Sequence, residues 1–145
     1  MVEKEIKKGF SIEIDSRLED VHLIGKEVKK ICQDLNLNSV ETYEIELCVV
    51  EACTNVIRHA YKKEPGNKVK VTMKLKNSSK LILKVYDNGK SMDPKYLYKT
   101  NSDIHKFSEG GRGLLIIKEL MDEVTYEKKK EGNVLTMIKR IHPVV

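Results

Sequence analysis

One stretch of the chain, from Glu41 to Tyr61, constrains the fold most, because its apolar residues recur at the spacing of a helix turn. At about 100° per residue, a single helix face collects Ile45, Val49, Ala52, Val56 and Ala60, with Cys48 and Cys53 at its flanks. A stripe of this kind predicts a long helix that packs lengthwise against the protein core.

The same stretch brings polar residues together. Glu51 and Asn55 are four positions apart, so they lie one turn apart on one face of the expected helix. Glu44 and Arg58 fall near the same line. Most polar helix faces are simply solvated, and this one gains significance only through motifs elsewhere in the chain.

Length and composition bound the class of protein. A chain of 145 residues has the size of one domain, and we expect residues 1–145 to form a single one. Hydrophobic and charged fractions of 40% and 34% are typical of soluble globular proteins. No apolar run approaches the ~18 residues of a membrane helix, and the first residues lack the apolar segment of a signal peptide. We therefore expect a cytoplasmic protein that does not bind membranes.

The three cysteines, Cys32, Cys48 and Cys53, lie on or beside apolar faces of expected helices. These positions favour buried, reduced thiols over a disulfide framework. No cysteine has an activating neighbour in sequence, so a catalytic thiol is not expected. The four histidines lack the spacing of metal ligands, which argues against a zinc site.

The chain is basic, with a net charge of +5. Its lysines are spread over almost every element and alternate with glutamates, without a basic stripe interleaved with aromatic residues. This distribution favours solubility, or attraction to an acidic partner or a polyphosphate, over direct binding of nucleic acid.

Periodicity and turn signals give the order of the elements. The expected strands are residues 10–15, 69–75, 81–85, 124–128 and 133–141, and the expected helices are residues 16–36, 38–61 and 114–122. Ser16 with Glu19, and Asn38 with Glu41, are expected to cap the first two helices. Residues 90–111 show no sustained periodicity, and a loop this long within a compact domain is usually functional or mobile.

This order of elements predicts the fold class. Most consecutive strands are joined by tight turns, so we expect a mixed, mainly antiparallel sheet. Three helices would cover one face of that sheet, which gives an α+β fold, a two-layer α/β sandwich.

Two further motifs have residues suited to a nucleotide. Asp87, Asn88 and Gly89 end a strand at the mouth of the long loop, where a carboxylate can accept a hydrogen bond from a base amino group. Glycines 110, 111 and 113 with Arg112 directly precede the expected third helix, so free N–H groups and the positive end of the helix would meet there. Taken alone, the first motif is also compatible with a plain turn, and the second with a hinge.

The sequence does not match other common nucleotide-binding motifs. Gly89, Lys90 and Ser91 resemble the end of a P-loop, but the earlier glycine of that motif would fall at Lys84. No GxGxxG motif follows a strand, and the HRD and DFG motifs of eukaryotic-type protein kinases are missing from the sequence.

The three motifs together resemble the histidine-kinase-like ATPases. The stretch from Glu51 to Tyr61 resembles the N box of that superfamily, Asp87 to Gly89 its first glycine box, and Gly110 to Leu114 its second. Their order, spacing and two-layer layout agree over essentially the whole chain. Within the superfamily, the sequence is most similar to bacterial anti-sigma factors that are also serine-protein kinases. Ser91 stands where the wider pattern has a glycine, which that branch often lacks too.

The resemblance implies roles for the polar pair on the central helix. Asn55 would ligate Mg²⁺ through its side-chain oxygen, with phosphates and water as the other ligands. Glu51 would be the general base that receives the proton of an attacking hydroxyl.

The resemblance also implies an ATP site. Asp87 would accept a hydrogen bond from the adenine amino group, and Gly89 would let the base lie close to the backbone. The second box, Gly111, Arg112, Gly113 and Leu114, would bind the phosphates, and residues 90–109 would form a lid over ATP.

In this family such a chain phosphorylates a serine on an anti-sigma-factor antagonist, sequesters an RNA polymerase sigma factor and forms a homodimer. It would thereby regulate transcription in sporulation or the stress response. The alternatives are a stand-alone ATP-binding domain of a two-component-type kinase or regulatory ATPase, and a non-catalytic binding module gated by ATP. A basic nucleic-acid-binding protein ranks last.

Overall fold

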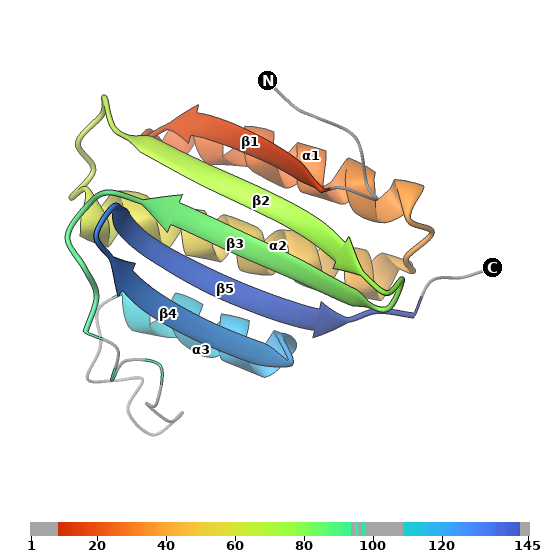
Figure 1. Cartoon of the computed structure of the whole chain (residues 1–145). Coiled ribbons are helices and arrows are strands. Elements are labelled where there is room, and N and C mark those ends of the chain that lie inside the picture. The colour runs from red at the N-terminus through yellow and green to blue at the C-terminus, as the bar shows by residue number, and fades with distance from the viewer. Residues whose placement is uncertain (1–8, 94, 96, 98–108, 143–145) are drawn as a thin grey trace.

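The computed structural model describes residues 9–93, 95, 97 and 109–142, with residues 109–111 described in their backbone only. A five-stranded sheet of order β1-β2-β3-β5-β4 is covered on one face by three helices (Figure 1). The elements are β1 (Phe10–Asp15), the 3₁₀ turn η1 (Leu18–Asp20), α1 (Val21–Asp34), α2 (Ser39–Asn55), the π-helical segment η2 (Val56–Ala60), β2 (Lys68–Lys76), β3 (Lys80–Asp87), α3 (Glu109–Leu120), β4 (Glu123–Lys129) and β5 (Gly132–Arg140).

The sheet follows directly from the alternation of side chains. In β2 and β3 the apolar residues point to the helices, and Val71 pairs with Val85 across the two strands. Both side chains are at most 1% exposed. The opposite face of these strands carries lysines, and the Lys70 ammonium lies 5.3 Å from the centre of the Tyr86 ring. The two-layer α+β fold is confirmed, and each of the four pairings among the described strands is antiparallel, without the parallel pair that a mixed sheet would have.

The two expected helix caps have different outcomes. Asn38 is confirmed, because its Oδ1 accepts the backbone N–H of Glu41 at 2.8 Å. Ser16 does not cap a helix. Its hydroxyl donates to the Glu64 carbonyl oxygen and accepts the N–H of Asn67 at 3.1 Å, so it joins the end of β1 to the turn before β2. The first helix therefore begins later than expected, with η1 and then α1.

The central helix has the extent that its apolar stripe predicts, but its last turn is wider than an α-helix. After Asn55 the chain continues as η2, and the N–H of Tyr61 donates to the Val56 oxygen at 3.0 Å, five residues earlier. Turns of this kind are rare and occur frequently at functional sites. The buried stripe includes Ile45, Val49 and Ala52, each at most 2% exposed.

The third helix begins earlier than the sequence indicated. α3 starts at Glu109, so the three glycines and Arg112 lie in its first turns rather than before it. The lid predicted for residues 90–109 lies largely outside the described residues. Within the described residues, no helix is long and apolar enough to span a membrane.

The three cysteines are buried free thiols, as expected. Burial raises the pKa of Cys32, Cys48 and Cys53 to about 12 in each case. Thiols with such a pKa remain protonated and unreactive near neutral pH.

Candidate functional site

The motif residues gather at one end of the molecule. There α2 ends, β3 ends and α3 begins, at the left of Figure 1. Two close approaches bring these segments together: Gly113 lies against α2, and Gly89 lies against η2. Motifs that are far apart in sequence therefore line one region.

Glu51 and Asn55 face the first part of α3. A methyl group at Gly113 would lie 2.9 Å from the Glu51 carboxylate oxygen Oε2 and 2.9 Å from Asn55 Nδ2. Both distances are shorter than real Cβ contacts, so a methyl group at this position would force the ends of both side chains to move. The structure thus brings together three residues that the sequence motifs predicted to act together.

The Asn55 side chain is suited to a ligand that is not protein. Its Nδ2 is buried and has no hydrogen-bond partner within the described residues. A half-turn of the amide would present Oδ1 in the same direction, and an amide oxygen is a ligand that Mg²⁺ accepts. No cluster of three or more His, Cys, Asp or Glu residues occurs in the described part of the chain, but Mg²⁺ held mainly by phosphates and water needs none. The donor set fits this metal.

Asp87 is a buried carboxylate at the end of β3. It is 6% exposed, and its Oδ1 accepts the N–H of Gly89 at 2.8 Å and Nδ2 of Asn133 at 2.9 Å. Burial raises the pKa of Asp87, and the hydrogen bonds from Asn133 and Gly89 oppose that effect. A hydrogen-bonded carboxylate held at the end of the central strand is a good acceptor for a ligand amino group.

Gly89 is required by close packing against η2. A methyl group at this position would lie 2.6 Å from the Ala60 carbonyl oxygen, and the N–H of Lys90 donates to the same oxygen at 3.0 Å. The neighbouring Tyr61 hydroxyl donates to the Lys68 oxygen at 2.7 Å and accepts the N–H of Asn88 at 2.8 Å. The turn after β3 is therefore fixed to the end of the central helix.

The remaining residues of the second glycine box are placed less directly. Arg112 is exposed on the first turns of α3, where a guanidinium can reach an anion at the helix N-terminus. The Leu114 side chain is 7% exposed and packs in the hydrophobic core, so contact with a ligand would involve its backbone. Gly111 belongs to α3, but only its backbone is described.

Three residues near Asp87 were not found from the sequence. Asn133 donates to Asp87, Tyr61 holds Asn88, and the Tyr126 hydroxyl accepts the N–H of Met92 at 2.9 Å. A polar residue directly after the Gly132 turn, at the position that alternates with the apolar Leu135 and Met137, was the available signal for Asn133. Its partner could not be identified without the sheet register.

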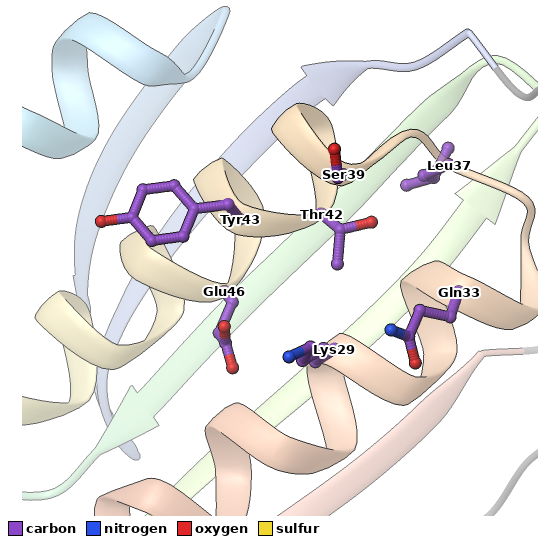
Figure 2. A pocket seen from close by; sticks show the side chains of 7 residues that line it. All are labelled: Lys29, Gln33, Leu37, Ser39, Thr42, Tyr43 and Glu46. Atoms are coloured by element: carbon purple, nitrogen blue, oxygen red, sulfur yellow. The ribbon is translucent and has the colours of Figure 1, made fainter.

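A hollow lies away from these residues, between α1 and the first half of α2. It has a volume of about 310 Å³ and is lined by Lys29, Gln33, Leu37, Ser39, Thr42, Tyr43 and Glu46 (Figure 2). None of the residues predicted from the motifs lines it. Its position at the opposite end of α2 separates it from the candidate site.

Comparison with known proteins identifies the family of the chain. The family described as "Histidine kinase-like ATPase domain" matches residues 14–139. The chain belongs to this family. The resemblance stated from the three sequence boxes is therefore confirmed, and the matched residues include all three.

Relatives of this ATPase-family chain include serine-protein kinases. A serine-protein kinase RsbW of Bacillus pumilus (strain SAFR-032) is 31% identical over 122 residues, which cover 79% of this chain and 75% of that protein. A serine-protein kinase RsbW of Bacillus cereus (strain ATCC 10987 / NRS 248) is 28% identical over 138 residues, which cover 91% of this chain and 84% of that protein.

Solved structures share the fold at low sequence identity. The structure of the RsbU and RsbW domains of Rv1364c from Mycobacterium tuberculosis matches with a TM-score of 0.65 and 14% identity, over 93% of this chain. The chain spans 34% of that longer protein. The histidine kinase domain of Erythrobacter litoralis EL346 matches with a TM-score of 0.53 and 16% identity, over 87% of this chain and 61% of the other.

Proposed function

We propose that this protein is an ATP-dependent anti-sigma factor that phosphorylates a serine on an anti-sigma-factor antagonist. The observation that carries the proposal is the contact of Glu51 and Asn55 with Gly113, which joins the expected base and metal ligand to the expected phosphate-binding helix. The names of its relatives support serine as the acceptor.

The proposed transfer uses Glu51 as a general base. The carboxylate accepts the proton of the serine hydroxyl as the serine oxygen forms a bond to the γ-phosphorus of ATP. The bond between that phosphorus and the β–γ bridging oxygen breaks, and ADP leaves with the electron pair. Asn55 would hold Mg²⁺, which supplies positive charge beside the phosphates. The first turns of α3 would bind phosphate oxygens through free N–H groups.

Asp87 is proposed to recognise the base. Its carboxylate would accept a hydrogen bond from the adenine amino group, while Gly89 lets the ring lie close to the backbone. Arg112, which is exposed on α3, would contact the phosphates.

The proposed partners are a sigma factor and the antagonist that carries the serine, and the proposed assembly is a homodimer. These partners are proposed from the family alone, since no surface of the described residues by itself selects a sigma factor. A net charge of +5 is compatible with an acidic partner.

Calorimetry with Mg²⁺ and ATP tests the site first. We expect wild-type protein to bind ATP in a Mg²⁺-dependent manner, and Asn55→Ala to lose that dependence because the amide ligand is gone. Glu51→Gln should retain binding but lower serine phosphorylation of the antagonist by ~10²–10⁴-fold. Glu46→Gln, on the same helix but lining the hollow between α1 and α2, is the matched control and should behave as wild type.

Three results would contradict the proposal. Absence of ATP binding would remove the enzyme function. Binding without transfer to the antagonist would favour an ATP-gated binding module, and transfer to histidine would favour a two-component-type kinase. A fourth result, full phosphate transfer by Glu51→Gln, would refute only the role of Glu51 as the general base.

A further inference from the structure

A buried polar pair lies where β3 ends and β5 begins, next to the proposed nucleotide site. Asp87 of β3 and Asn133 of β5 are directly paired in the sheet register, and they are 6% and 3% exposed. Polar side chains buried this deeply remain only where hydrogen bonds compensate the lost water. The pair therefore has to be understood through its hydrogen bonds.

The amide of Asn133 can adopt only one orientation. Its Nδ2 donates to Asp87 Oδ1 at 2.9 Å and to the Gly89 carbonyl oxygen at 3.1 Å. Both partners are acceptors only, so they require the NH₂ end of the amide. The other end, Oδ1, accepts the Ser91 hydroxyl at 2.7 Å.

This arrangement distinguishes the two oxygens of Asp87. Oδ1 accepts two hydrogen bonds, one from Asn133 and one from the N–H of Gly89 at 2.8 Å. Among the described residues, Oδ2 accepts none. Because Oδ1 is held from two directions, rotation of the carboxylate is restricted and Oδ2 keeps a fixed direction.

We propose that Asn133 and Ser91 are positioning residues that fix the Asp87 carboxylate, so that its free oxygen selects adenine over guanine. The inference rests on the proposed nucleotide site and adds to it the residues that set base specificity. An amino group, as on adenine, can donate to that oxygen. Guanine has a carbonyl oxygen at the same position, and two acceptors would face each other without a proton between them.

Ser91 stands at the position where the wider family has the second glycine of the first box. Glycine at this position has no hydroxyl to donate, whereas Ser91 holds Asn133 Oδ1 and thereby its NH₂ end toward Asp87. The next residue, Met92, is held in turn by the Tyr126 hydroxyl at 2.9 Å. The backbone that carries Ser91 is thus fixed to β4 as well as to β5.

The test is the ratio of ATP to GTP affinity, measured by calorimetry on the full chain with Mg²⁺. We expect Ser91→Ala to lower this ratio about fivefold and Asn133→Leu to lower it tenfold or more, as the loss of one and then of several hydrogen bonds implies. Ser91→Thr keeps the hydroxyl and should restore the ratio. Ser11→Ala on the distant strand β1 is the matched control and should leave the ratio unchanged.

Thermal unfolding of the same variants separates positioning from stability. If Ser91→Ala and Asn133→Leu lower the melting temperature while the ATP to GTP ratio stays at the wild-type value, the inference is wrong and the pair is only structural. Ser91 is half-buried, so its alanine variant remains informative even if Asn133→Leu does not fold. Wild-type protein that binds neither nucleotide would overturn the proposed function and this inference together.

Discussion

The two ends of α2 use their polar residues in opposite ways. At the first end, Asn38 caps the helix through the Glu41 N–H at 2.8 Å, and Glu44 forms an ion pair with Lys139 at 3.1 Å. At the second end, Asn55 Nδ2 is buried without a partner among the described residues. The polar groups of the first end are used within the fold, whereas the second end has a buried donor that no described residue satisfies, as the proposed ligand site would require.

The difference is visible in the backbone as well. The first end is a regular α-helix, while the second widens into η2 and is approached closely by glycines 89 and 113. Thr42, whose buried Oγ1 also has no hydrogen-bond partner in the part of the chain that the structure describes, is the exception at the first end and borders the hollow of Figure 2. Polar groups that lack partners are therefore a guide to function only when several features of the backbone agree with them.

The largest effect should come from filling the space at Gly113. A methyl group there would come within 2.9 Å of Glu51 Oε2 and of Asn55 Nδ2, so Gly113→Ala should displace both side chains. We expect the free energy of unfolding to fall by ~1–3 kcal/mol and ATP affinity to fall more than tenfold. Urea unfolding and calorimetry measure the two effects.

Gly25→Ala is the matched control for this comparison. Its methyl group would meet the Val50 methyl Cγ2 at 3.1 Å, which is an aliphatic contact on the side of α2 that faces α1, whereas Glu51 and Asn55 face Gly113 of α3. ATP affinity should remain at the wild-type value. Equal losses of affinity in both glycine variants would show that the two regions do not differ as we describe.

An intermediate effect is expected from removing the cap at the first end. Asn38→Ala deletes the acceptor for the Glu41 N–H, which should lower the free energy of unfolding by ~1 kcal/mol. Because the cap is far from the site along α2, ATP affinity should not change. Loss of affinity in this variant would mean that the two ends are coupled through the helix.

The smallest effect should be the pH dependence that arises from Asp87. Burial raises the pKa of this carboxyl above its ordinary value of 3.8, so a growing fraction is protonated as the solution becomes acidic. We expect ATP affinity to decrease as pH falls through the raised pKa of Asp87, and the decrease to be smaller in Asp87→Asn. Calorimetry over this range measures it, and identical pH profiles of the two proteins would contradict the assignment.

The same raised pKa acts on stability in the opposite direction. The protonated carboxyl is favoured by the folded state, so the stability that it contributes is present below pH 3.8 and is lost as pH rises through the folded-state pKa. Asp87→Asn should therefore gain stability relative to wild type near neutral pH. A residue kept at the expense of stability is consistent with a role in binding.

Much of the fold could be predicted, because its signals are local. The alternation of Val69, Val71 and Met73 and the apolar stripe of α2 depend only on near neighbours in sequence, and both are confirmed. The cap at Asn38 is likewise local. Ser16 has the same local pattern, but its hydroxyl bonds residues 64 and 67 instead, which no short-range rule anticipates.

The candidate site was only partly predictable for a related reason. Glu51, Asn55 and Asp87 stand out by spacing and by motif, whereas the start of α3 was missed because glycines disfavour helices. Asn133 lies 46 residues from Asp87, and only the register of β3 with β5 reveals that they are partners. The roles of all these residues in catalysis and binding remain predictions.

The sheet order has a consequence for how the chain folds. β3 and β5 are neighbours although α3 and β4 lie between them in sequence, so their pairing must close a long loop, whereas β2 and β3 form a hairpin. Loop closure costs conformational entropy before its contacts form, which slows the pairing of distant strands. We expect the β2–β3 hairpin to form early and the Asp87–Asn133 junction late. Nucleotide bound at that junction would then slow unfolding more than it accelerates folding.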